Sequence, residues 1–318
     1  MNDGALIELV LNVLECSQKD LAKQLDVSAA QISKWKKGDY MSRDMQLRLR
    51  ELAGIGEMEP EFVLWAGTVE DALKWRRLMR YQAEMAKEGA ETGYNTYLLD
   101  DSEIDFLCWN TFSVLKELGL DIPNPFPKDL DFDYEEDDDS WEILEENVYA
   151  GLIQNIYRAL NDVYGFYAAY ISELMNDDRL GLMDTEAEGI EPSLLSLAAT
   201  KLTDIPSQAV NFRAFRHRVT QDFEKWLSLV KKQAFQFGVP LRAEVMDLAY
   251  GSADELSHSA EAESFGINES RIHPDIYMNE LLVGMRAIHQ VLPAILKKLE
   301  IEDEFKLDAS QLRVHPNR

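Results

Sequence analysis

Residues 17–38 read SQKDLAKQLDVSAAQISKWKKG, and their spacing predicts two short helices packed around a tight turn. Ser17 and Ser28 are each placed to cap the start of a helix, because a serine hydroxyl accepts a hydrogen bond from a free backbone N–H there. Asp26 falls in the turn, and Gly38 ends the second helix, where a left-handed backbone costs glycine little. The apolar residues that we expect to face inward are Leu21, Ala22, Leu25, Ile32 and Trp35.

The outward face of the second predicted helix is short, polar and positive. Its residues are Ser28, Ala29, Ala30, Gln31, Ser33, Lys34 and Lys37. Such a face suits insertion into the major groove of DNA, where polar side chains hydrogen-bond to base edges. The alternative is a helical hairpin that does not bind DNA, and this interpretation gives the exposed lysines no role.

The pattern Gln18-x-x-Leu21-Ala22-x-x-Leu25-x-Val27-Ser28-x-x-x-Ile32-Ser33-x-Trp35-x-x-Gly38 resembles the phage-repressor family of helix-turn-helix proteins (Cro and λ-repressor-like, or XRE). The resemblance covers residues 4–54, about a sixth of the chain. Asp26 departs from the family pattern, which usually has glycine there, but aspartate tolerates a left-handed backbone better than most residues.

The resemblance implies a role for each matched position. The residues expected to face base edges are Ala29, Ala30, Gln31 and Lys34, and those expected to contact phosphates are Gln18, Ser28, Ser33, Lys36 and Lys37. Two of the residues expected to face base edges are alanines, which suggests apolar contact with thymine methyl groups. The family also implies a homodimer on double-stranded DNA, reading a two-fold operator whose half-sites lie about 10 bp apart or a multiple of that.

The net charge of the chain is unevenly distributed. The 318 residues carry a net charge of −26, yet residues 1–55 contain eight basic and eight acidic side chains, so all the excess acid lies beyond them. Phosphate attraction drives non-specific DNA binding, and an acidic body opposes it. We therefore expect weak non-specific affinity, with useful binding only where several groove contacts act together.

Several features predict a cytoplasmic protein with no membrane partner. Two cysteines, Cys16 and Cys108, exclude a disulfide framework and fit a reducing compartment. Residues 1–16 lack a basic n-region, so they read as the first helix of the bundle, with Cys16 on its inner side, and not as a signal peptide. The most hydrophobic stretch, 281–299, carries three basic residues and a proline, which predicts a core helix and not a membrane span.

The rest of the chain also has helical periodicity, which predicts an all-α fold: a λ-repressor-like bundle over 1–56, then a larger acidic helical domain over 57–318. The expected helices after the recognition helix are 42–53, 68–87, 102–119, 141–175 with possible breaks at Gly151 and Gly165, 193–202, 207–237, 240–250, 253–263 and 275–299. Apolar residues over 141–175 and 207–237 make these two segments candidates for a dimer interface, although such stripes are usually core.

An acidic loop is expected near residues 121–140. A calcium-binding interpretation of it uses Asp131, Asp133, Glu135, Asp139 and Glu142 as ligands, but Glu136 stands where the loop needs a glycine. A solvated or disordered loop is the simpler interpretation. A third possibility is a segment that mimics DNA and competes for the lysines of the recognition helix.

The remaining constellations do not point to an enzyme. The basic cluster Arg213, Arg216, His217 and Arg218 could hold a phosphate-bearing effector, but pairing with neighbouring carboxylates explains it as well. The five histidines are scattered, and the sequence has no metal-ligand spacing, no phosphate-binding glycine loop and no identifiable triad. We therefore expect no catalytic residue, no metal and no cofactor.

The sequence predicts a transcriptional regulator, most simply a repressor, that binds its operator as a dimer and responds to a small-molecule or protein effector. The alternative is an antitoxin-like or defence-system subunit, whose helical body holds a partner protein while the helix-turn-helix regulates its own gene.

Overall fold

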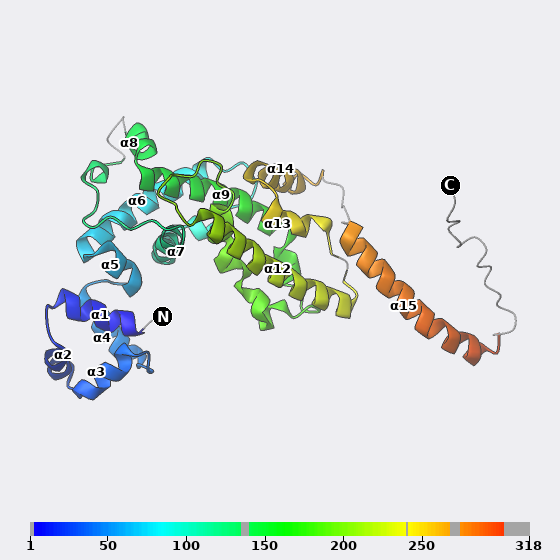
Figure 1. The fold of residues 1–318 in the computed structure, drawn as a ribbon, viewed down its shortest axis with the longest axis horizontal. Coiled ribbons are helices and arrows are strands. Elements are labelled where there is room, and N and C mark those ends of the chain that lie inside the picture. The colour runs from blue at the N-terminus through cyan, green and yellow to red at the C-terminus, as the bar shows by residue number, and fades with distance from the viewer. Residues whose placement is uncertain (1–2, 135–139, 240, 268–273, 302–318) are drawn as a thin grey trace.

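The computed structural model describes residues 3–134, 140–239, 241–267 and 274–301. Every regular element in these ranges is a helix, and none of the described residues lies in a strand. The predicted all-α fold class is therefore confirmed. Figure 1 shows a small group of helices at the N-terminus, a larger body, and one long helix that stands apart at the other end.

The first four helices form a compact unit, here called the head. They are α1 (Asp3–Val13), α2 (Gln18–Leu25), α3 (Ala29–Lys36) and α4 (Arg43–Ala53). Helix α1 packs against both α3 and α4, and α2 packs against α3. Cys16 lies in the turn after α1, where it is half-buried against the core, so its predicted place on the helix is wrong.

The head joins the rest of the chain through packed residues. Ile55 and Met58 are buried on either side of the predicted domain boundary between residues 56 and 57. The buried guanidinium of Arg50 donates to the backbone carbonyls of Gly56 (3.0 Å) and Met58 (2.9 Å). Helix α5 (Pro60–Ala66) follows directly and packs against α1. The apolar core therefore runs without a break from the head into the body.

The body, residues 60–264, is built around α9 (Val148–Tyr170), which packs against α6 (Val69–Glu88), α11 (Leu194–Ala199) and α14 (Ala253–Ser264). Its other helices are α7 (Ile104–Glu117), α8 (Ser140–Glu146), α10 (Ser172–Met175), α12 (Phe212–Phe237) and α13 (Asp247–Tyr250), and its 3₁₀ turns are η1 (Tyr97–Leu99), η2 (Asp101–Glu103), η3 (Lys128–Leu130), η4 (Leu182–Asp184), η5 (Glu186–Ser193) and η6 (Ala243–Met246).

The two glycines expected to break residues 141–175 lie inside α9 instead. The helix boundaries fall at Asn147, whose side chain caps α9, and at Ile171. Gly165 is needed for close approach, because a Cβ there would lie 2.5 Å from the Cβ of Thr92. A Cβ at Gly151 would lie 2.9 Å from the carbonyl oxygen of Glu145. Both glycines therefore allow tight packing and do not interrupt the helix.

The long apolar stripe predicted over 207–237 is used inside the chain. Helix α12 buries Phe215, Val219, Phe223, Leu227, Val230 and Ala234, and it packs against η5 and α11. The stripe ends early, because Phe237 is exposed. Leu73 of α6, an apolar residue of the helix predicted over 68–87, is also exposed. Since α9 and α12 bury their apolar faces within the chain, the two segments expected to supply a dimer interface are already covered.

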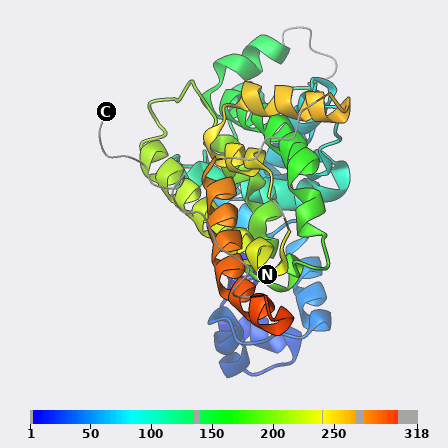
Figure 2. The same cartoon turned by 90° about the vertical axis from the view of Figure 1, so that its right-hand side faces the viewer.

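The last described helix, α15 (Pro274–Leu299), starts at Pro274, which fits the first turn of a helix because proline lacks the N–H that is free there. It packs extensively against none of the other described elements. The prediction that 281–299 is a core helix is therefore wrong for the single chain, because most of its described apolar side chains are exposed. Figure 2, viewed from that end of the molecule, shows α15 crossing in front of the body. None of the described helices combines the length and the hydropathy that a membrane span requires.

Candidate nucleic-acid interface

Helix α2 begins at a complete capping box. The Ser17 hydroxyl accepts from the Asp20 backbone N–H (3.3 Å) and donates to the Asp20 carboxylate (2.6 Å). The Ser17 backbone N–H donates to the same carboxylate (3.4 Å). These hydrogen bonds stabilise the charged form, so the pKa of Asp20 lies below its usual value. The cap predicted at Ser17 is present, and it fixes where α2 starts.

The turn between α2 and α3 contains the left-handed residue expected from the sequence. Asp26 has φ 58° and ψ 44°. Its backbone N–H reaches the carbonyls of Ala22 and Lys23, and the Val27 N–H donates to Ala22 (2.9 Å). This hydrogen bonding closes the end of α2, although the position has no glycine. Arg48 of α4 adds to it, because its guanidinium donates to the carbonyl of Gln24 (2.9 Å).

Helix α3 is anchored at both ends. The Ser28 hydroxyl accepts from the Gln31 backbone N–H (3.1 Å), as its predicted capping role requires. Ile32 and Trp35 are buried in the head. The Trp35 indole N–H donates to the Tyr40 carbonyl (3.1 Å), which holds the loop after α3 against the helix. Helix α3 therefore has a fixed orientation, and one of its faces lies open to solvent.

All nine side chains expected to contact DNA lie on α2, on α3 or at their caps. The exposed ones are Ser28, Ala29, Ala30, Lys34, Lys36 and Lys37, and the half-buried ones are Gln18, Gln31 and Ser33. None of the nine is fully buried. The structure thus brings together on the outside of the head every residue that the sequence assigned to base edges or phosphates.

The cations of the head have different surroundings. Lys36 forms an ion pair with Glu8 of α1 (3.6 Å), and both side chains are largely exposed. Arg48 and Arg50 are bound to backbone carbonyls, so their role in the head is structural. Within the described part of the chain, Lys34 and Lys37 have no carboxylate at ion-pair distance. They are the two head lysines on α3 or its cap that no carboxylate neutralises.

One exposed aromatic residue near α3 was missed in the sequence. Tyr40 is 86% exposed, in the loop whose backbone the Trp35 indole holds. A large aromatic ring two residues after the run Lys36, Lys37 and Gly38 is the sequence signal that could have identified it. Its ring and hydroxyl can contact a sugar or a phosphate beside the groove.

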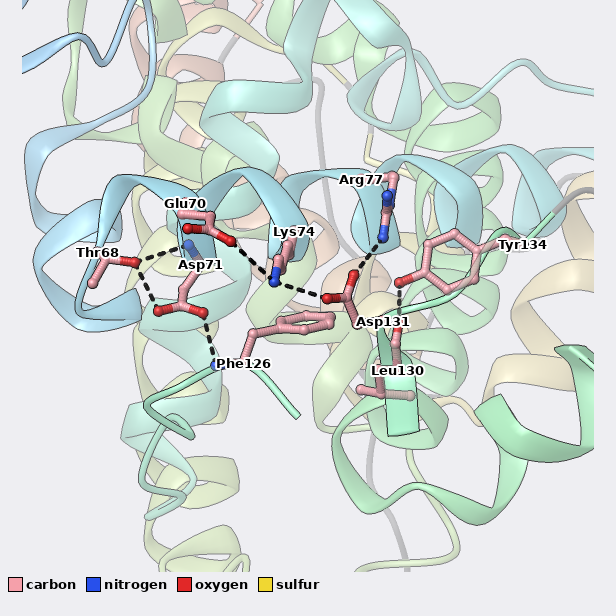
Figure 3. Close-up of polar contacts among 9 residues, drawn as sticks. All are labelled: Thr68, Glu70, Asp71, Lys74, Arg77, Phe126, Leu130, Asp131 and Tyr134. Atoms are coloured by element: carbon pink, nitrogen blue, oxygen red, sulfur yellow. Dashed lines mark hydrogen bonds and ion pairs between the residues drawn. The ribbon is translucent and has the colours of Figure 1, made fainter. Parts of the chain in front are cut away.

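The acidic segment after residue 127 is packed on the body as far as it is described. Asp131 accepts from Lys74 (2.8 Å) and Arg77 (2.9 Å) of α6, and Leu130 and Tyr134 are buried (Figure 3). The cations keep the pKa of Asp131 below its usual value. Residues 128–134 are therefore ordered against the body, while Asp129, Asp131 and Asp133 stay exposed to solvent, and residues 135–139 lie outside the described ranges. The calcium interpretation loses Asp131, because two cations occupy its carboxylate.

The basic cluster on α12 is exposed and partly paired. Arg218 forms an ion pair with Glu117 of α7, and its guanidinium lies over the Phe215 ring, 5.5 Å from the centroid. Arg213, Arg216 and His217 are exposed. The pairing interpretation thus holds for Arg218.

A depression of about 300 Å³ between α9, α11 and α14 contains two residues that sequence reasoning missed. Burial raises the pKa of Asp162 to about 6. Burial also lowers the pKa of Lys201 to about 8, with the Arg216 charge as the next cause. The Lys201 ammonium donates to the carbonyls of Ala249 (2.8 Å) and Gly251 (2.7 Å), so it ends α13. Nothing in the local sequence around either residue signals this burial.

Among the described residues, no group of three or more His, Cys, Asp or Glu side chains is placed to hold a metal ion. Comparison with known proteins adds no functional assignment, because no family model, curated protein or solved structure matches the chain.

Proposed function

We propose that the chain is a sequence-specific DNA-binding transcriptional repressor, with the head as a helix-turn-helix module and α3 as its recognition helix. The observation that carries the proposal is the open face of α3. Ser28 caps the helix and Trp35 anchors it, while Lys34 projects outward with no ion pair among the described residues. A fixed helix with a polar, positive face is what major-groove reading requires.

The two kinds of contact divide along α3. Ala29, Ala30, Gln31 and Lys34 lie in its first two turns, which enter the groove first when a recognition helix docks by its N-terminal half. Lys36 and Lys37 lie at its C-terminal end, where they reach the phosphate backbone. Direct readout would then rest on Gln31 and Lys34, with the alanines packing on thymine methyl groups.

The acidic body shapes the affinity. The residues beyond 55 carry the entire net charge of −26 and repel phosphate at long range, so binding to random sequence is weak. A single head makes few base contacts, and two heads on a two-fold operator supply the rest. An effector that favours one spacing of the two recognition helices then changes operator affinity.

Genome-wide mapping of sites bound by the intact protein tests the proposal and finds the operator. On that operator, Lys34→Ala should weaken binding by about 1–3 kcal/mol and relax specificity at one base position. Lys36→Ala should weaken binding to all sequences alike and reduce the salt slope by about one. Glu8→Gln should strengthen binding alike for all sequences, because it leaves Lys36 unpaired.

The matched control is Lys232→Ala, which removes an exposed lysine from α12, outside the head. It should bind operator like the wild type. Equal binding by the Lys34 and Lys36 variants would show that α3 does not dock in the groove. A wild-type protein that ignores every genomic fragment at low ionic strength would overturn the proposal itself.

A further inference from the structure

Helix α15 carries a regular apolar seam, of which only Leu292 is half-buried and the other residues are exposed. Its seam residues are Leu281, Met285, Ile288, Leu292, Ile295 and Leu299. Their separations alternate between four and three, which is the spacing of the a and d positions of a coiled coil. Ile288 is 62% exposed and Leu299 is 60% exposed. A helix with such an exposed apolar face tends to associate in water, because association removes that face from solvent.

We propose that α15 is the dimerisation element of this protein, and that its partner is the α15 helix of a second copy, running antiparallel. The inference deepens the proposed function, which needs two heads on one operator, but it concerns a separate surface. It is therefore open to test without DNA.

The seam is self-complementary in the antiparallel direction. Antiparallel coiled coils pair an a position with a d position, and a two-fold axis beside residue 290 does this for all six seam residues. Leu281 then meets Leu299 of the second copy, Met285 meets Ile295, and Ile288 meets Leu292. Each helix supplies the same patch to the other, as a two-fold dimer requires.

Charge also favours the antiparallel direction. Between residues 281 and 299 the charged side chains are all basic: Arg286, Lys297 and Lys298, with His289 beside them. A parallel pair would bring the basic ends of both helices, which contain Lys297 and Lys298, to the same end of the dimer. An antiparallel pair instead places them near the other copy's body, which is strongly acidic.

The proline of α15 is compatible with this pairing. Pro293 follows seam residue Leu292, so it occupies a b position on the outer side of the helix. A bend at Pro293 therefore leaves the seam continuous and curves the helix toward its partner, since long helices are convex toward solvent.

The available area is sufficient for a dimer. From their exposed fractions, the apolar side chains of α15 offer on the order of 600 Å² per copy, so that a pair buries about 1,200 Å², the lower bound of stable interfaces. Leu282, Val291 and Leu296 widen the face beyond the seam, so the partner covers its flanks as well. Phe235, Phe237, Phe265 and Ile267 are exposed at the ends of α12 and α14, on the side of the body from which α15 departs (Figure 1).

The test compares two aspartate substitutions on the same helix. The full chain is analysed without DNA by sedimentation equilibrium and by light scattering over a wide concentration range. The wild type should be a dimer. Ile288→Asp should raise the dimer dissociation constant at least ~100-fold, because it places an unpaired charge in the seam. Gln290→Asp adds the same charge on the outer face and should leave the dimer intact. Circular dichroism melting of the dilute variants should match the wild type.

The direction of pairing is tested by disulfide cross-linking. A mixture of Met285→Cys and Ile295→Cys copies should give a cross-linked heterodimer, and neither variant alone should cross-link at the introduced position. Cross-linking of Met285→Cys with itself would overturn the antiparallel arrangement.

Three other outcomes would overturn the inference: a monomeric wild type, a dimer that Ile288→Asp leaves unchanged, or a seam covered only by a different protein or a lipid surface. The proposed function fails separately. A dimer without affinity for any genomic fragment overturns DNA binding alone, whereas a monomer that binds operator overturns only the role of α15.

Discussion

Helices α12 and α15 have the same length, 26 residues, and each carries an apolar stripe at helical spacing. Their surroundings are opposite. Helix α12 lies against η5 and α11, with Phe215, Phe223 and Val230 buried. Helix α15 leaves most of its stripe exposed to solvent. Amphipathic spacing therefore predicts that a helix face will be covered, but it does not say whether the cover comes from the same chain.

The largest expected effect is a difference in how much stability is lost when an apolar residue is truncated in α12 or in α15. Phe215→Ala should lower the free energy of unfolding by about 3–5 kcal/mol, because it empties a filled site in the core. Ile288→Ala should change it by less than about 0.5 kcal/mol, provided that the protein is dilute enough to be monomeric. Urea unfolding at low protein concentration measures both. Similar losses for the two variants would mean that α15 is covered within the single chain.

Glycine substitutions sharpen the same contrast. Gly165→Ala should destabilise the protein by about 1–3 kcal/mol, because its Cβ would overlap Thr92 on the covered side of α9. Gly284→Ala in α15 meets no atom within 4 Å, and it should stabilise by about 0.5–1 kcal/mol through helix propensity. Thermal melting of the two variants checks the opposite signs. A loss of stability in Gly284→Ala at low concentration would reveal a contact along α15 within the chain.

The last expected effect depends on pH and concerns a carboxyl group on the covered side of α9. Burial raises the pKa of Asp162 to about 6, above its unfolded value near 3.8. The folded state then holds more protons between pH 4 and 6, so this group lowers stability as pH rises through that range. We compare the free energy of unfolding of Asp162→Asn with that of the wild type at two pH values. The difference should favour the variant by about 1–2 kcal/mol more at pH 7 than at pH 4.

The control for this titration is Asp178→Asn, which changes an exposed carboxyl group after α10. Its stability difference from the wild type should be nearly the same at both pH values. If the stability difference between Asp162→Asn and the wild type is also independent of pH, the carboxyl group is solvated in the folded protein and α14 does not cover it.

The sequence predicted local structure, such as helix caps and turns, better than it predicted which elements pack against each helix. Ser17, Asp26 and Ser28 could be assigned because capping and left-handed turns depend on neighbouring backbone groups alone. Gly165 is only a possible break by sequence, and its place inside α9 could not be predicted, because its use depends on Thr92, far away in the chain. The burial of Asp162 and Lys201 also depends on distant elements. The nine residues expected to face DNA lie together on the head, but their binding stays a prediction.

The buried guanidinium of Arg50 has a consequence for how two half-sites could be spaced. Its hydrogen bonds to the carbonyls of Gly56 and Met58 hold the segment between head and body in place, so the head is not attached by a flexible linker. A head fixed to its body has one reach, while each base pair inserted between half-sites shifts the second one by about 3.4 Å and turns it by roughly 34° around the duplex. A change in the length of the spacer would therefore have to be met by movement between the two bodies and not between a head and its body.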